Sequence, residues 1–135
     1  MTFPLLFSYL NFEARKENSY IEIGKNTWIN NNANFISSGP GIFIGSDCAI
    51  GVNVTIFDSD FHPLDPQIRM SGQPKTGKVV IGDNVFIGSN ASILKGVTVG
   101  SNSVIGFGSI VTKDIPANTI ACGNPAKIIR CITAT

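Results

Sequence analysis

Branched apolar residues recur at every sixth position over much of this chain. A helix cannot produce this period, because six residues turn its side chain to another face, whereas short extended segments that end in turns can. A Val or a small residue also stands two positions before each member of the later series, so both side chains should point inward. The pattern predicts short strands, with Gly or Asn at the corners that need a positive φ. The recurring positions are Ile23, Ile29, Phe35, Ile44, Ile50, Ile56, Ile81, Ile87, Ile93, Val99, Ile105 and Val111.

Three such segments would complete one triangular coil, so residues 18 apart should stack. The expected stacked pairs are Ile81 with Val99, Ile87 with Ile105, and Ile93 with Val111. We expect an all-β, parallel β-helix of about four coils (23–35, 44–56, 81–93 and 99–111) that forms one domain over residues 1–135. An ordinary β-sandwich with evenly spaced turns is the alternative. The expected parts are an N-terminal cap (1–20), coils (21–56 and 79–112), an extruded loop (57–78) and a C-terminal tail (113–135). The tail should leave the prism and fold back along it or across a neighbouring copy.

The long loop interrupts the period after Ile56, and a shorter insertion follows Phe35. Both come after the third segment of a coil, so they should emerge at the same edge, and loops on a rigid scaffold often carry function. The long loop holds His62, the only histidine in the chain. Imidazole suits a general base near neutrality because its unperturbed pKa is roughly 6.5, although a lone histidine can also be incidental. Asp58 or Asp60 could orient the ring, or serve only turn geometry.

Composition narrows the possible partners. The 135 residues include 10 Lys and Arg against 9 Asp and Glu, so the near-neutral charge argues against binding nucleic acid. Charged residues are only 14% of the chain and apolar residues 43%, which favours burial of surface between copies. No stretch has the roughly 18 apolar residues that span a bilayer, and residues 1–10 do not read as a signal peptide. Three scattered cysteines without a CxxC pair predict neither a disulfide framework nor a metal site, and favour the cytoplasm.

Several runs resemble the hexapeptide-repeat acyltransferases, in particular the galactoside and maltose O-acetyltransferases. They are Ile81-Gly-Asp-Asn-Val-Phe-Ile-Gly-Ser89, Gly96-Val-Thr-Val-Gly-Ser-Asn-Ser-Val-Ile-Gly106, Ser109-Ile-Val-Thr-Lys-Asp-Ile-Pro-Ala-Asn118 and Gly123-Asn-Pro-Ala-Lys-Ile-Ile-Arg130. The resemblance covers about residues 21–132. It implies a left-handed β-helix, a homotrimer, acetyl-CoA as the donor and His62 as the general base. The short N-terminal region resembles the O-acetyltransferases found with surface-polysaccharide assembly, and leaves the acceptor open.

The resemblance also implies roles for other residues. It places Asn30 at the acceptor sugar. Asp58 is a further candidate for the substrate site and Asp60 for the catalytic site, from their positions beside His62, although turn geometry would explain all three. The backbone N–H of Ser89 is the implied donor to the thioester oxygen. The remaining implied contacts are with CoA, although a solvated basic tail would explain the cations equally well. These contacts are Phe86, where relatives often have Trp, and Ser109, Thr112, Lys113, Lys127 and Arg130.

The sequence therefore predicts an acetyl-CoA-dependent O-acetyltransferase that acts on a carbohydrate hydroxyl by direct attack. An amino sugar, an amino acid or an antibiotic is the alternative acceptor. A non-enzymatic β-helix scaffold is the alternative of another class. A metal enzyme resembling the γ-type carbonic anhydrases is disfavoured, because that site takes three histidines and this chain has one. No acyl-enzyme is expected, because Cys48 falls at an inward position.

Overall fold

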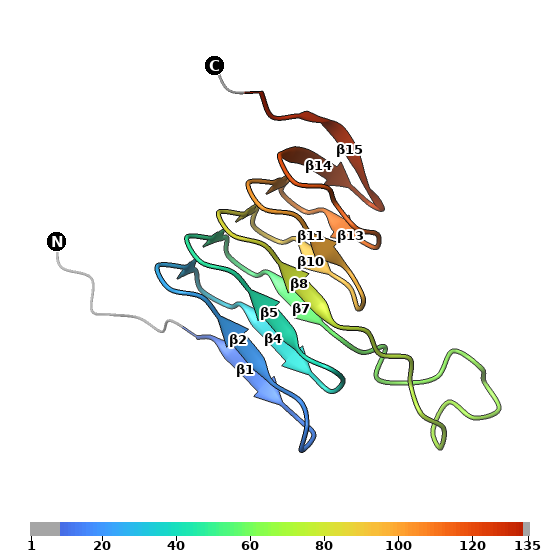
Figure 1. The fold of residues 1–135 in the computed structure, drawn as a ribbon. Coiled ribbons are helices and arrows are strands. Elements are labelled where there is room, and N and C mark those ends of the chain that lie inside the picture. Colours follow the sequence, from blue (N-terminus) through green and yellow to red (C-terminus); the bar gives the residue numbers. More distant parts are fainter. Residues whose placement is uncertain (1–8, 134–135) are drawn as a thin grey trace, which may run out of the picture.

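The computed structural model describes residues 9–133, and within this range every regular element is a short strand. The strands wind into a three-sided prism, which Figure 1 shows from the side with the coils stacked one above another. Each coil contributes one strand to each of three sheets, here called sheets I, II and III. The described chain is thus all-β, as the sequence predicts. Neighbouring strands in each sheet are parallel, except for β14 and β15 at the C-terminal end.

The three sheets have these strands in spatial order. Sheet I contains β1 (Asn11–Ala14), β4 (Asn34–Ser37), β7 (Thr55–Phe57), β10 (Ser92–Ile93) and β13 (Ile110–Val111). Sheet II contains β2 (Ile21–Ile23), β5 (Ile42–Ile44), β8 (Val79–Ile81) and β11 (Thr98–Val99). Sheet III contains β3 (Trp28–Ile29), β6 (Ala49–Ile50), β9 (Phe86–Ile87), β12 (Val104–Ile105), β14 (Thr119–Gly123) and β15 (Ala126–Cys131).

The register of the strands confirms the predicted stacking of residues 18 apart. Val99 pairs with Ile81 in sheet II, Ile105 with Ile87 in sheet III, and Val111 with Ile93 in sheet I. The left-handed sense of winding stays a prediction from the resemblance.

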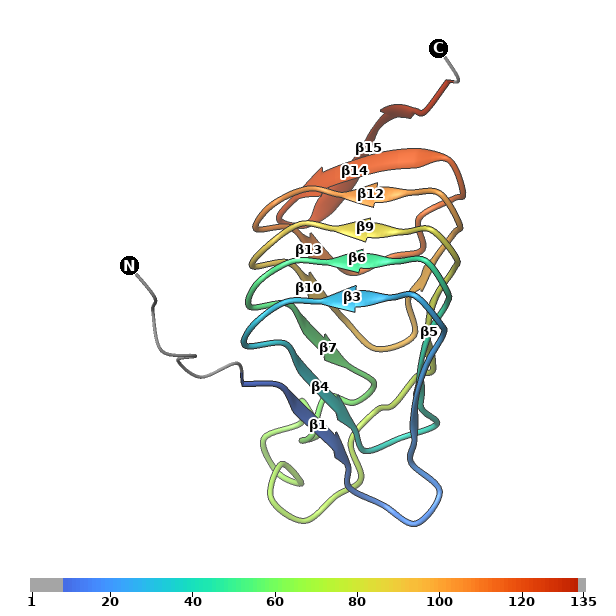
Figure 2. The same ribbon diagram turned by 90° about the vertical axis from the view of Figure 1, so that its left-hand side faces the viewer.

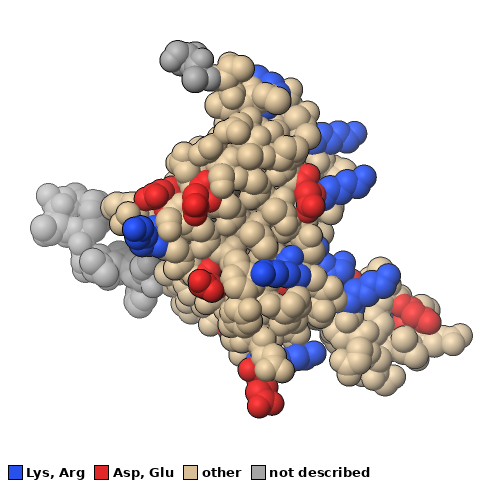
Figure 3. All heavy atoms as spheres, in the orientation of Figure 1, with Lys and Arg blue, Asp and Glu red and all other residues tan. Residues whose placement is uncertain are grey.

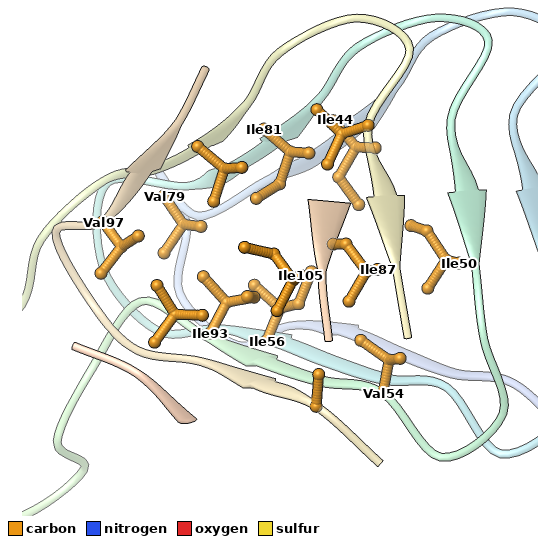
Figure 4. Packing of buried hydrophobic residues seen from close by; sticks show 14 of the residues in the cluster. Ile44, Ile50, Val54, Ile56, Val79, Ile81, Ile87, Ile93, Val97 and Ile105 are labelled. Carbon is orange, nitrogen blue, oxygen red and sulfur yellow. The ribbon is translucent and has the colours of Figure 1, made fainter. Parts of the chain in front are cut away.

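The core fills the prism from end to end with aliphatic side chains, as Figure 4 shows from close by. The ten recurring positions from Phe35 onward are buried, whereas Ile23 and Ile29 in the first coil are half-buried. Those two lie near the N-terminal end of the stack, where fewer coils cover them. Cys48 is buried in the same core, and this desolvation raises the pKa of its thiol.

Asparagine and aspartate side chains stack along the edge between sheets II and III. Asn84 Nδ2 donates to Asn102 Oδ1 at 3.0 Å, and Asn102 Nδ2 donates to Asn118 Oδ1 at 2.9 Å. All three have a positive φ, between 54° and 64°, which Asn tolerates better than most residues. The corners therefore need these residue types both for the turn and for the hydrogen bonds between successive coils.

The C-terminal segment differs from the sequence prediction. The sequence predicts that the repeat stops at Lys113 and that the tail then folds back along the prism or across a neighbour, but Ile115 still bridges to Val99 in parallel and β14 pairs with β12. The register explains the error, because Ala121 pairs with Ile105 across 16 residues rather than 18. The turn is two residues shorter than in the other coils, so counting in steps of six residues misses one more parallel strand. Only β15 turns back, and it lies antiparallel on β14.

The edge between sheets I and II carries both insertions, as predicted. We call it the insertion edge. Its connections are residues 15–20, 38–41, 58–78, 94–97 and 112–114. The longest starts at Asp58, because Phe57 still belongs to β7, and Figure 1 shows it projecting from one side of the prism.

The N-terminal cap is described only in part. β1 extends sheet I beyond β4, and Phe12 stacks on Phe35 with ring centroids 4.9 Å apart. Residues 1–8, on which the rest of the predicted cap falls, lie outside the described residues. In the described range, no helix has the length and apolar character needed to cross a bilayer.

Candidate active site

Asp58 fixes the base of the long loop. Its carboxylate is fully buried and accepts hydrogen bonds from Ser37 Oγ at 2.6 Å and from the backbone N–H groups of Ser38 at 2.7 Å, Gly39 at 3.2 Å and Gly41 at 2.8 Å. These donors belong to β4 and to the connection that follows it, so Asp58 ties the two insertions together. The predicted contact of Asp58 with the acceptor is therefore corrected, because the carboxylate is enclosed and its oxygens already accept four hydrogen bonds.

His62 lies on the exposed part of the same loop, with its ring held in one orientation. Its Nδ1 is 3.1 Å from the carbonyl oxygen of Arg69. Because a carbonyl oxygen only accepts, this contact requires the proton on Nδ1. In the neutral ring, Nε2 then keeps its lone pair. An imidazole in this tautomer can take a proton from a substrate.

Neither carboxylate that the sequence offers for orienting His62 does so. Asp58 is buried beneath the loop, and Asp60 Oδ1 forms an ion pair with Lys95 Nζ at 2.8 Å. The orienting group is instead the Arg69 carbonyl. Sequence reasoning missed Arg69 because a backbone carbonyl has no residue-type signature, and Lys95 because its partner lies 35 positions earlier on the same edge.

Ser89 lies on another edge, between sheets III and I, here called the Ser89 edge. At comparable corners the second N–H donates to an oxygen in the next coil, as Val52 N does to Ser89 Oγ at 3.0 Å and Asp83 N to Ser101 Oγ at 3.0 Å. Above Ser89 the next coil has Phe107, whose side chain offers no acceptor. Among residues 9–133, the Ser89 N–H accordingly has no acceptor, which suits a donor to a ligand oxygen.

Asn30 and Phe86 lie on or beside the outer face of sheet III. Asn30 is exposed and its Nδ2 donates to Ile50 O at 3.1 Å, so part of its amide serves the turn. Phe86 is 52% exposed, and its backbone neighbours in the sheet are Ala49 and Val104. Both side chains are accessible to a ligand on this face.

The predicted CoA contacts separate into accessible and inaccessible groups. Thr112 and Lys113 are exposed on the insertion edge, and Lys127 and Arg130 are exposed on β15. Figure 3 shows Lys and Arg side chains protruding along this edge of the prism, above the long loop. Ser109 is corrected, because it is fully buried and its Oγ accepts a hydrogen bond from the Gly123 N–H at 3.1 Å. Its hydroxyl holds the end of β14 and does not face a ligand.

One chain does not bring these groups together. His62 projects from the insertion edge, whereas Ser89 and Asn30 lie on the Ser89 edge. Figure 2 shows the strands of sheet III in front, and Figure 1 shows the long loop projecting from the right-hand side, opposite the side that Figure 2 turns toward the viewer. A base and an oxyanion donor must both lie about 3 Å from the reacting atoms. His62 and Ser89 lie at different edges of the prism, on connections that join different pairs of sheets.

A hollow of about 310 Å³ is formed by residues of the long loop. Its walls combine apolar and charged side chains, namely Asp60, Pro63, Leu64, Asp65, Ile68, Gln73 and Lys75. Within the described residues, no cluster of three or more His, Cys, Asp or Glu side chains could hold a metal ion.

Comparison with known proteins shows which family has sequences similar to this chain. Residues 78–113 match the model of the bacterial transferase hexapeptide (six repeats). The galactoside O-acetyltransferase of Escherichia coli K12 is 42% identical over 127 residues, which is 94% of this chain and 58% of that protein. The chain thus spans under two thirds of the length of this curated relative.

Two solved structures match over a larger share of their length. The hexapeptide-repeat containing acetyltransferase VCA0836 of Vibrio cholerae O1 biovar eltor, complexed with acetyl-coenzyme A, has a TM-score of 0.76 at 31% identity, over 96% of this chain and 73% of that chain. The maltose O-acetyltransferase of Clostridium difficile 630 has a TM-score of 0.72 at 40% identity, over 93% and 68%. With such identity over more than two thirds of solved relatives, this chain belongs to the hexapeptide-repeat acetyltransferase family.

Proposed function

We propose that this protein transfers the acetyl group of acetyl-CoA to a carbohydrate hydroxyl, with His62 as the general base. The observation that carries the proposal is the imidazole whose Nδ1 faces the Arg69 carbonyl and whose Nε2 is left as an acceptor. Family membership supports the reaction type. The relatives named for galactoside and maltose support a sugar acceptor, and the acetyl-CoA complex of the Vibrio protein supports the donor.

The proposed reaction is a direct transfer. Nε2 of His62 takes the proton of the acceptor hydroxyl while the oxygen attacks the acetyl carbonyl carbon. The Ser89 N–H stabilises the oxyanion of the tetrahedral intermediate, and the carbon–sulfur bond then breaks. The imidazolium returns its proton to the CoA thiolate, so no net proton is consumed. Cys48 takes no part as a nucleophile, because it is buried and its thiol pKa is raised.

We further propose that the site forms between two copies in a homotrimer. The separation of His62 from Ser89 within one prism supports this arrangement. In a closed ring the insertion edge of each copy can face the Ser89 edge of the next. The exposed aromatic side chains of sheet III also support it, since Trp28 is 77% and Phe86 52% exposed. Three exposed cations would bind the CoA phosphates. They are Lys113, which follows Thr112, and Lys127 and Arg130 on β15.

A substitution above Ser89 tests its proposed role as a donor. Phe107→Ser places a hydroxyl where other corners have one, so it should accept from the Ser89 N–H and compete with the thioester oxygen. We expect kcat to fall by about tenfold to a hundredfold, short of the 10²–10³ that complete loss of an oxyanion donor costs. Phe107→Ala is the matched control, because it removes the ring without adding an acceptor. Equal kcat values for the two variants, measured by release of CoA thiol, would show that the Ser89 N–H is not a donor in the reaction.

The function itself is tested by screening acceptors in the presence of acetyl-CoA. Thiol release with free sugars, nucleotide sugars or oligosaccharides supports the proposal. Release only with amino sugars, amino acids or aminoglycoside antibiotics would contradict O-acetylation of a carbohydrate. A change in Tm on adding millimolar CoA provides an independent reading, since a ligand that binds the folded state raises stability. The absence of both would favour a scaffold without enzymatic activity.

A further inference from the structure

The residue before the proposed base has an unusual backbone conformation. Phe61 has φ of 62°, in the left-handed region that bulky L-residues rarely adopt. The other non-glycine residues with positive φ in residues 9–133 are all Asn or Asp. Asn or Gly at position 61 would adopt this φ with less strain. Contacts of the aromatic ring must therefore offset the free-energy cost of this backbone conformation.

Three contacts hold Phe61 in this conformation. Its N–H donates to Ser59 Oγ at 2.9 Å, which closes the turn before the histidine. Its ring meets the ring of Phe57, at the end of β7, edge-on with centroids 5.1 Å apart. The guanidinium of Arg15 lies over the same ring, 5.5 Å from its centroid. The loop is thereby attached to the outer face of sheet I.

Arg15 is itself held by the N-terminal strand. Its Nε donates to Glu13 Oε2 at 2.6 Å, and its backbone N–H donates to Ser37 O at 2.8 Å. Glu13 lies in β1, which pairs with β4. This hydrogen bond with Arg15 is the largest cause that lowers the pKa of Glu13, so the carboxylate stays charged near neutrality. A continuous set of contacts thus joins β1 to the residue that precedes His62.

We propose that the Phe57–Phe61–Arg15 cluster positions the base. By holding the left-handed turn at Phe61, it directs the His62 ring so that Nδ1 meets the Arg69 carbonyl and Nε2 stays free. This inference rests on the proposed function of His62. Phe61 and Arg15 are positioning residues, since neither contacts a reacting atom. The N-terminal strand then contributes to the site, beyond extending the end of the prism.

The single histidine makes the proposal directly measurable. With ¹⁵N-labelled protein freed of any histidine tag, the imidazole resonances come only from His62 and report which ring nitrogen carries the proton. We expect the Nδ1–H tautomer in the wild type. In Phe61→Asn, which keeps the turn and loses the ring, we expect the resonances to move toward those of a free neutral histidine. A wild-type ring protonated at Nε2, or an unchanged tautomer in Phe61→Asn, would overturn the proposal.

Kinetics provide the second reading. Phe61→Asn should lower kcat by about tenfold to a hundredfold, as for a misplaced catalytic group, with the KM for acetyl-CoA unchanged. Arg15→Ala should lower kcat less, and Arg15→Lys should restore part of the loss because it keeps a cation over the ring. Tyr20→Ala is the matched control, since it removes a ring in similar edge-on contact with Phe43 on sheet II. An equal loss in Tyr20→Ala would overturn the positioning role.

The two possible failures can be distinguished. If His62→Ala keeps wild-type kcat, the proposed base is wrong, whatever the tautomer. If His62→Ala loses activity but Phe61→Asn keeps both the tautomer and kcat, the base is right and the cluster does not position it. Arg15 is exposed, so its variants remain informative even if Phe61→Asn folds poorly.

Discussion

Replacing His62 with alanine should lower kcat by about 10²–10⁴-fold, the usual contribution of a general base. The KM for acetyl-CoA should change by less than about twofold, because the imidazole acts on the acceptor proton and does not bind the donor. The measurement is release of CoA thiol at saturating acetyl-CoA and acceptor. It separates loss of chemistry from loss of donor binding.

Gln67→Ala is the control for this substitution. Gln67 lies on the same loop and is exposed, and its backbone N–H, which the substitution keeps, donates to Asp65 Oδ1 at 2.9 Å. Its replacement should leave kcat and Tm close to the wild-type values. The proposed role of His62 fails if the alanine variant keeps more than about a tenth of the wild-type kcat, which is too much for a lost general base.

Replacing Asp58 with alanine should mainly reduce stability. The substitution leaves the Ser37 hydroxyl and the Gly41 N–H buried without an acceptor, at about 1–3 kcal/mol each. The free energy of unfolding should fall by roughly 2–6 kcal/mol and Tm by roughly 10 °C or more. Both should be measured at one protein concentration, because oligomerisation also shifts Tm.

Asp65→Ala provides the comparison for Asp58. Asp65 is an exposed carboxylate on the same loop that accepts one hydrogen bond, from Gln67 N. Its loss should change stability by less than about 1 kcal/mol. An unchanged Tm in Asp58→Ala, together with a large rise in the KM for the acceptor, would instead support contact of Asp58 with the acceptor.

The stacked coils could be predicted from the sequence because they depend on a local rule. A side chain at each sixth position has to face the core, so the spacing itself gives the register, as the pairing of Ile81 with Val99 confirms. The six-residue rule fails where the distance between core positions changes although the coil continues. The turn before Ile115 is two residues shorter, and the strand that follows went unrecognised.

The site was less predictable, because its geometry depends on contacts between distant connections. Asp58 was recognised as noteworthy, but its donors lie 17 to 21 positions earlier and decide that it is structural. The orientation of His62 depends on a backbone carbonyl, and the conformation of Phe61 on Arg15, the residue that follows β1. Neither has a signature in residue type. The availability of the Ser89 N–H likewise becomes visible only when Phe107 is placed above it.

The central claim is that His62 of one copy and Ser89 of the next form one site, and mixed oligomers test it most directly. His62→Ala lacks the base, and Ser89→Pro lacks the backbone donor, so each alone should be nearly inactive. The two variants are co-expressed in equal amounts and purified together. If they assemble at random around a ring, about a quarter of the interfaces join an intact His62 edge to an intact Ser89 edge. We predict about a quarter of the wild-type rate of thiol release. Activity no greater than the sum of the two separate variants would contradict a site shared between copies.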